Sequence, residues 1–212
     1  DDIVHFKHIK ASQLSSEEVK RLQEQIDKVS AFGSYTKQDV KSWYESNRID
    51  LDEYTQYIEN LSYQSSQETF LNVEIIYLAQ HYYLPVIRST EDKVSYLKHI
   101  IDEKSEIEFL QSLQQYISNK EMPHQWMFSK IDEGKDHFYI PYFDRQTNQY
   151  RKFYPDFIFW ITDGYRYKIV FIDPKGIRQA DYQNKVDGFE NMFLDSNGEK
   201  RTFTYKNYQI HF

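Results

Sequence analysis

The feature that most constrains the fold of this chain is a pair of apolar runs that follow one another closely. The runs are "YPDFIFWI" at residues 154–161 and "YKIVFIDPKG" at residues 167–176. β-Branched and aromatic residues of this kind suit strands that are buried in a sheet. The connection between the runs contains Asp163-Gly164, a dipeptide favoured in hairpin turns. The two runs therefore predict an antiparallel pair of buried strands.

The first third of the chain has the periodicity of helices. Residues 15–18 have the Ser-x-x-Glu spacing of a capping box, and apolar residues follow at helical intervals. Thr36 is suited to cap a second, short helix. Apolar residues over 51–61 outline a third helix.

A polar stretch at 62–69 separates these helices from the rest of the chain. We therefore expect a helical segment at 1–66, to which no role is assigned, followed by a second domain at 67–212.

The second domain has the pattern of an α/β fold with a mixed sheet. The expected strands are 70–87, 93–101, 124–131, 151–162, 165–173 and 201–212, and the expected helices are 103–118 and 178–193. A helix over 71–82 is an alternative to the strand at 70–87. From residue 103 onward the order is helix, three strands, helix and strand.

Composition excludes several classes of protein. The chain has no cysteine, which excludes disulfides and thiolate zinc sites and fits a cytoplasmic setting. No run approaches the length of a membrane span and no signal peptide opens the chain, so we expect no membrane association. The chain begins with Asp1 and not with Met, so we expect it to be part of a longer protein.

Charge is distributed unevenly along the 212 residues. The formal net charge is −7, and all of this excess lies in residues 1–120, whereas acids and bases balance in residues 121–212. The acidity argues against a general nucleic-acid binder, but a neutral second half can still present a basic groove.

The segment that ends the second apolar run allows two interpretations. Asp173, Pro174 and a glycine at 176 have the signature of a type I turn. If Asp163-Gly164 forms a two-residue turn, however, Asp156 faces Phe171 and has Asp173 as its diagonal neighbour. Diagonal neighbours are about 7–8 Å apart, so the two carboxylates can converge on one ion.

A third acid can join this pair. On the helix expected at 103–118, Glu106 falls within the apolar stripe, whereas Glu108 falls nearly opposite. The stripe consists of Phe109, Leu110, Leu113, Tyr116 and Ile117. A carboxylate on a buried stripe is costly unless it is paired. Glu106 is therefore either a site residue or an N-terminal acid that favours the helix dipole and reaches solvent.

These residues together describe a site for a hard metal ion. Magnesium prefers carboxylate and carbonyl oxygen, which Asp156, Asp173, Glu106 and the carbonyl of Pro174 offer. Manganese can substitute for it. Such an ion would polarise a phosphodiester and activate a bound water. Lys175 would orient that water or offset the charge that builds on the phosphate. The expected reaction is hydrolysis of a phosphodiester.

The same residues resemble the PD-(D/E)xK nuclease superfamily. The wording is most similar to the C-terminal endonuclease domain of the helicase (Res) subunit of type III restriction enzymes, over roughly residues 70–190. The similar segments are "HYYLPVI", "SEIEFL", "WMFSKI", "FYPDFIFWI" and "FIDPKG". The resemblance carries the catalytic acids onto Glu106, Asp156 and Asp173 and the catalytic lysine onto Lys175.

The resemblance also implies a cofactor and partners. It implies a restriction-endonuclease-like core, a magnesium ion and double-stranded DNA as the substrate. ATP would act only through a helicase portion of the parent chain, and a modification methyltransferase subunit would be the partner.

The remaining motifs carry less chemistry. The seven histidines show no metal-ligand spacing, and no glycine-rich phosphate loop is present. Lys185 is the favoured contact to the DNA backbone, with Arg178 and Lys152 as further candidates. Two alternatives remain: a catalytically silent module that docks helicase and partner subunit, and a nuclease that acts on RNA or on repair intermediates.

Overall fold

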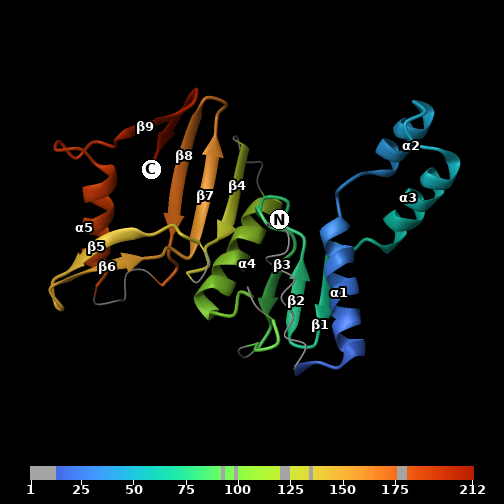
Figure 1. Ribbon diagram of the computed structural model, residues 1–212, viewed down its shortest axis with the longest axis horizontal. Coiled ribbons are helices and arrows are strands. Elements are labelled where there is room, and N and C mark those ends of the chain that lie inside the picture. Colours follow the sequence, from blue (N-terminus) through green and yellow to red (C-terminus); the bar gives the residue numbers. More distant parts are fainter. Residues whose placement is uncertain (1–12, 92–93, 98–99, 120–124, 134–135, 176–180) are drawn as a thin grey trace. The chain divides into compact units, whose positions relative to one another are not determined.

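The structure is a computed structural model, and it describes residues 13–91, 94–97, 100–119, 125–133, 136–175 and 181–212 (Figure 1). It is a mixed α/β structure, as the sequence predicts. The helices are α1 (Ser16–Ala31), α2 (Lys37–Glu45), α3 (Leu51–Tyr63), α4 (Lys104–Asn119) and α5 (Tyr182–Phe193). The strands are β1 (Gln67–Phe70), β2 (Val73–Ile76), β3 (Val86–Ser89), β4 (Gln125–Lys130), β5 (Ile140–Asp144), β6 (Gln149–Phe153), β7 (Phe157–Thr162), β8 (Arg166–Ile172), β9 (Thr202–Tyr205) and β10 (Tyr208–His211). No helix in the described part of the chain is long and apolar enough to cross a membrane.

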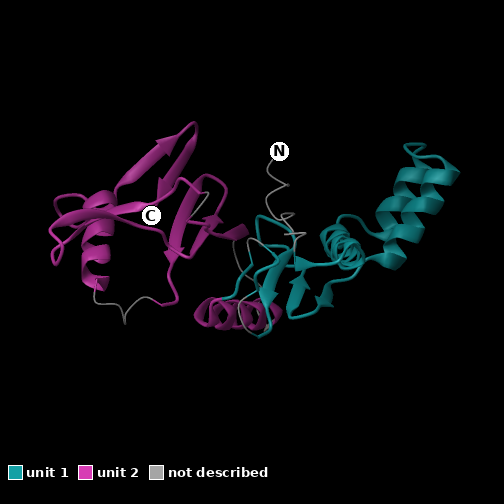
Figure 2. Cartoon of the chain, turned by 60° about the horizontal axis from the view of Figure 1, so that its bottom comes forward, with its two compact units in different colours: residues 1–102 teal, residues 103–212 magenta. Residues whose placement is uncertain are grey.

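The chain divides into two compact units, residues 1–102 and 103–212 (Figure 2). The polar stretch at 62–69 predicts a division at residue 66. In the structure, β1, β2 and β3 form an antiparallel sheet whose apolar residues share one core with Leu22 and Ile26 of α1. The hydrophobic core therefore joins these strands to the N-terminal helix.

The helices of the first unit begin where the sequence predicts. Ser15, Thr36 and Asp50 are the N-caps of α1, α2 and α3, and each makes a capping box with the acid three residues later. Trp43 of α2 packs against Tyr57 of α3 with ring centroids 5.5 Å apart.

Two expectations for the first unit are wrong. The single strand expected over 70–87 is not formed, because this segment contains β2, irregular structure and the start of β3. The alternative helix over 71–82 is not formed either. The strand expected over 93–101 is not formed in its described part, where Ile101 makes only an isolated bridge to Arg88. The apolar side chains of this segment, such as Leu97, are instead buried in the core.

The second unit is built on a five-stranded mixed sheet of order β4-β7-β8-β10-β9. β10 pairs with β8 in parallel, and the other neighbours are antiparallel. On one face, Phe109 of α4 packs on Phe157 of β7, with ring centroids 4.9 Å apart. On the other face, Phe171 of β8 contacts Phe193 of α5, with ring centroids 6.1 Å apart. The sheet thus lies between two helices.

Two expected strands are divided in the structure. The segment 151–162 is interrupted at Pro155, which cannot donate to a sheet ladder, and so contributes to both β6 and β7. β6 pairs with β5 in a separate two-stranded sheet that the sequence analysis did not predict. The segment 201–212 forms a hairpin because the chain turns at Lys206, whose φ is 52°.

Candidate functional site

The register of β7 and β8 sets the position of the two aspartates. Ile158 lies opposite Phe171, so the prediction that Asp156 faces Phe171 is wrong. The turn is centred one residue later than assumed, because the Asp163 N–H donates to the Arg166 carbonyl oxygen with Gly164 and Tyr165 between them. The Asp163 carboxylate also accepts the backbone N–H of Arg166. The register moves by an even number of residues, and Asp156 and Asp173 each lie one residue beyond the last pair, Phe157 and Ile172. The two aspartates therefore come opposite one another.

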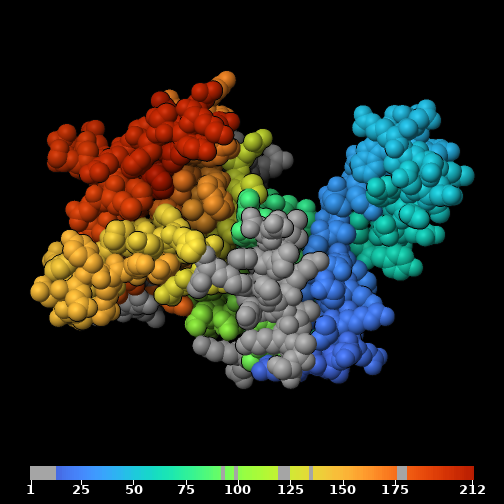
Figure 3. Space-filling view, in the orientation of Figure 1, coloured from blue at the N-terminus to red at the C-terminus, as the bar shows by residue number. Residues whose placement is uncertain are grey.

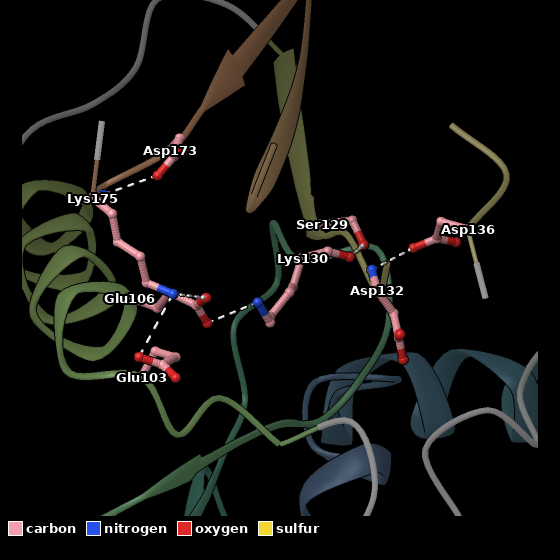
Figure 4. A network of polar contacts seen from close by, with 8 residues as sticks. All are labelled: Glu103, Glu106, Ser129, Lys130, Asp132, Asp136, Asp173 and Lys175. Carbon is pink, nitrogen blue, oxygen red and sulfur yellow. Dashed lines mark hydrogen bonds and ion pairs between the residues drawn. The ribbon is translucent and has the colours of Figure 1, made fainter. Parts of the chain in front are cut away.

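Asp173 also makes the turn that its sequence predicts. Its Oδ1 accepts the backbone N–H of Lys175 at 3.0 Å, and Pro174 and Lys175 form the turn. The turn interpretation and the site interpretation are compatible, because the same turn directs the Lys175 side chain towards α4 (Figure 4).

Glu106 is buried on the first turn of α4, and only 3% of its side chain is exposed. The alternative that it reaches solvent is therefore wrong. Its Oε2 lies 2.7 Å from Lys130 Nζ, and its Oε1 lies 3.9 Å from Lys175 Nζ (Figure 4). Glu108 is exposed and pairs with Lys104, as the helical periodicity predicts. Of the apolar stripe, Tyr116 differs from expectation, since it is exposed.

Two residues of this cluster were missed by the sequence analysis. Lys130 ends β4 opposite Phe157, and Glu103 lies 3.6 Å from Lys175 Nζ. A polar residue at the end of an apolar strand was the available signal for Lys130. Its partner depends on the pairing of β4 with β7, which the sequence does not give.

The surroundings of Asp156 disfavour its ionised form. Its backbone carbonyl accepts the N–H of Ile131, but its buried Oδ2 has no hydrogen-bond partner among the described residues. Burial raises the pKa of Asp156 to about 7, with further contributions from the charges of Glu106 and Asp173. The positive charges of Lys130 and Lys175 oppose this rise.

Lys175 responds to the same field in the opposite direction. Burial alone would lower its pKa, but the carboxylates of Asp156, Glu103 and Glu106 outweigh that effect and raise it. Lys175 therefore remains a cation beside the acids at neutral pH.

The donor set fits a hard cation by its chemistry. No group of three His, Asp or Glu side chains is already arranged as a metal site in the described part of the chain. Asp156 nevertheless has an unpaired, buried carboxylate oxygen and two neighbouring acids that disfavour its ionisation. A divalent ion would relieve both conditions, since it supplies positive charge to carboxylate oxygen.

The expected DNA contacts lie in different places. Lys185 pairs with Asp181 at 3.3 Å and lies over the ring of Phe153. Lys152 lies over the ring of Tyr139. Arg178 lies outside the described residues.

A family model described as the YagJ family matches residues 97–206, which is more than half of the chain. The chain belongs to the YagJ family. The part that matches the YagJ model runs from the segment before α4 to the end of β9, so it contains Glu106, Asp156, Asp173 and Lys175. No curated protein and no solved structure matches the chain.

Proposed function

We propose that this YagJ-family chain is a metal-dependent endonuclease domain with a restriction-endonuclease-like core. The observation that carries the proposal is the cluster of Glu106, Asp156, Asp173 and Lys175 at the ends of α4, β7 and β8. A buried carboxylate oxygen without a partner, beside two further acids, is unfavourable unless a cation completes the site.

The topology of the second unit supports the same proposal. α4, the meander β4-β7-β8, α5 and the parallel strand β10 follow the helix, three strands, helix and strand expected of such a core. β5, β6 and β9 are additions to this order.

Asp156 and Asp173 would hold the metal ion, together with Glu106 and the carbonyl of Pro174. When bound, magnesium supplies a Lewis acid for the phosphodiester and a bound water of lowered pKa. Lys175 offsets negative charge that develops on the phosphate. Glu106 and Glu103 hold the Lys175 ammonium group in place.

The parent machinery is part of the proposal and rests on the resemblance in sequence alone. The chain would work with a helicase portion that uses ATP and with a modification methyltransferase, and it would cut double-stranded DNA.

The test combines metal binding with cleavage. We expect Mn²⁺ to bind the wild type, as measured by electron paramagnetic resonance, and to bind Asp156→Asn and Asp173→Asn at least about 10-fold more weakly. Asn keeps an oxygen that can accept the Lys175 N–H, so the turn is retained. Asp187→Asn, on α5 of the same unit, is the control.

Cleavage of plasmid DNA with Mg²⁺ should follow the same order, with a loss of at least about 100-fold in the two site variants. Metal binding or metal-dependent cutting that is unchanged in both variants contradicts the assigned site.

A further inference from the structure

Two adjoining cavities lie on the second unit, beside the candidate site. The first, which we call the aromatic cavity, has a volume of about 450 Å³. It is lined by the rings of Phe153, Phe171, Tyr182, Phe189 and Phe212, and by Lys168, Lys185, Lys200 and Asp173. Its walls come from β8, from α5 and from the β5–β6 hairpin, which is yellow to orange in Figure 3. Asp173 is the residue of the carboxylate cluster that lines the aromatic cavity.

The second, which we call the basic cavity, has a volume of about 390 Å³. Its charged lining consists of Arg166, Lys168, Lys200, His211 and a single acid, Asp163. The Asp163 carboxylate is already engaged by the backbone N–H of Arg166. Among the described residues, no carboxylate forms an ion pair with the side chain of Arg166, Lys168 or Lys200. The basic cavity therefore carries uncompensated positive charge in a chain of net charge −7.

Lys168 and Lys200 line both cavities, so the two adjoin at these residues. β8 connects them from Arg166 in the basic cavity to Asp173 in the aromatic cavity. At about 3.3 Å per residue this segment spans about 23 Å. A linear polyanion could thus contact both cavities at once.

The face of the sheet beside the basic cavity is polar and exposed. Lys168 lies opposite His211, and Arg166 lies opposite Gln209. On the neighbouring strand, Thr202 lies opposite His211. This face has donors for phosphate oxygen, and Asp163 is the acid among the described residues that line the basic cavity beside it. The other face of β8 packs against aromatic side chains of α5.

We propose that the two cavities bind a single nucleic-acid strand, with an unpaired base in the aromatic cavity and the adjoining phosphates on Lys168, Lys200 and Arg166. Proteins that bind single strands combine base stacking on aromatic rings with a cationic groove for the backbone. A base enters a cavity between a helix and a sheet only after it leaves the duplex stack. The inference deepens the proposed function and rests on it, because it makes the strand at the candidate site an unpaired one.

Binding is measured without divalent metal, so that it does not depend on cleavage. Fluorescence anisotropy compares a labelled single-stranded oligonucleotide with a duplex of the same length and with a strand that contains abasic positions. We expect the single strand to bind at least about 10-fold more tightly than the duplex, and the abasic strand to bind at least about 5-fold more weakly than the intact one.

Variants assign the binding to the two cavities. Lys168→Ala combined with Lys200→Ala removes two exposed cations, and we expect an affinity loss of about 10-fold or more and a salt dependence reduced by about two phosphate contacts. Tyr182→Ala should weaken the intact strand but not the abasic one, because Tyr182 is part of the base cavity and is 38% exposed. The control is Lys20→Ala combined with Lys41→Ala, which makes the same charge change on α1 and α2.

Equal affinity for single strand, duplex and abasic strand overturns the inference, as does an affinity that the Lys168 and Lys200 changes leave intact. Failure of the proposed function gives a different result: the single strand binds as expected, but neither the single strand nor the duplex is cut with Mg²⁺.

Discussion

Lys130 Nζ lies 2.7 Å from Oε2 of Glu106, whose side chain is only 3% exposed to solvent. The two residues come from the end of β4 and the first turn of α4. Their ion pair ties the helix to the sheet at the edge where Asp156 and Asp173 lie. The candidate site is therefore held by a buried electrostatic contact as well as by apolar packing.

Removal of the Glu106 charge should destabilise the second unit. Glu106→Gln removes the carboxylate that lies 2.7 Å from the Lys130 ammonium group. We expect a loss of about 2–4 kcal/mol in the free energy of unfolding. Urea denaturation provides the measurement. A double-mutant cycle with Lys130→Met should return a coupling of about 1–3 kcal/mol.

Glu108→Gln is the matched control on the same helix. Glu108 is 63% exposed and lies 3.8 Å from Lys104, so its loss should cost less than about 0.5 kcal/mol. Equal effects at Glu106 and Glu108 would show that the buried pair contributes no special stability.

The sequence predicted the side of α4 on which Glu106 lies because helical geometry is fixed at 100° per residue. It also predicted that Asp156 and Asp173 share a site, although the assumed turn was wrong. An error of an even number of residues leaves every side chain of a strand on its original face. The two aspartates remain opposite one another because the turn is centred on Gly164 and Tyr165, one residue later than assumed, which moves the register by two residues.

Other parts of the site were beyond reach of the sequence because they depend on contacts between distant segments. The position of Lys130 beside Glu106 requires the pairing of β4 with β7. To predict that β1, β2 and β3 share a core with α1, one must know which apolar faces pack together. The polar stretch at 62–69 instead suggested that these strands and α1 belong to different domains. Local composition marked where the chain turns, but not which surfaces pack.

The raised pKa of Asp156 should make the second unit less stable as the pH rises. Folding raises this pKa from 3.8 to about 7, so the folded chain keeps a proton that the unfolded chain has already lost. The associated stability is fully present below pH 3.8 and is lost as the pH rises towards about 7. After allowance for solvent screening of this partly buried group, we expect a fall of about 1–2 kcal/mol.

Urea denaturation between pH 5 and pH 8 measures this fall. Asp156→Asn should remove it, since the amide does not titrate. Glu108→Gln should retain the fall of the wild type. A wild-type profile that rises over this interval would contradict the raised pKa.

His81 should give the first unit the opposite dependence on pH. Burial lowers the pKa of His81 from 6.5 to about 4, although its hydrogen bond with Tyr83 acts against this shift. The unfolded chain therefore gains a proton first, and stability is lost as the pH falls from 6.5 to about 4. Hydrogen exchange of β1, β2 and β3 should show about 2–3 kcal/mol less protection at the acid end.

His81→Gln should flatten this profile in the first unit while the profile of the second unit remains. The two units thus serve as internal references for each other. A flat wild-type profile in β1, β2 and β3 would mean that His81 titrates near its ordinary pKa.

Gly188 lies where α5 passes close to β5. A Cβ added there would come within 2.7 Å of the Pro141 carbonyl oxygen and of Tyr142 Cβ. In an open helix, Gly→Ala would stabilise by about 1 kcal/mol, but here we expect a loss of about 1–3 kcal/mol from overpacking. Thermal unfolding measures the sign of the change, and Glu190→Ala on the exposed side of α5 is the control.

Magnesium should stabilise the second unit at pH 7.5 more than at pH 5. A divalent ion beside Asp156 and Asp173 favours their ionised forms, so it lowers the pKa of Asp156 and releases a proton on binding. Near pH 5 the proton on Asp156 competes with the ion for the carboxylate, because the pKa of Asp156 is about 7 in the metal-free chain. We expect a rise in Tm of a few degrees at pH 7.5 with about 10 mM Mg²⁺, and a smaller rise at pH 5.

Sodium chloride of equal ionic strength should not reproduce the difference, and Asp156→Asn should abolish it. An equal response to Mg²⁺ in the wild type and in Asp156→Asn would separate the strained carboxylate from metal binding and leave its raised pKa without a role in the proposed site.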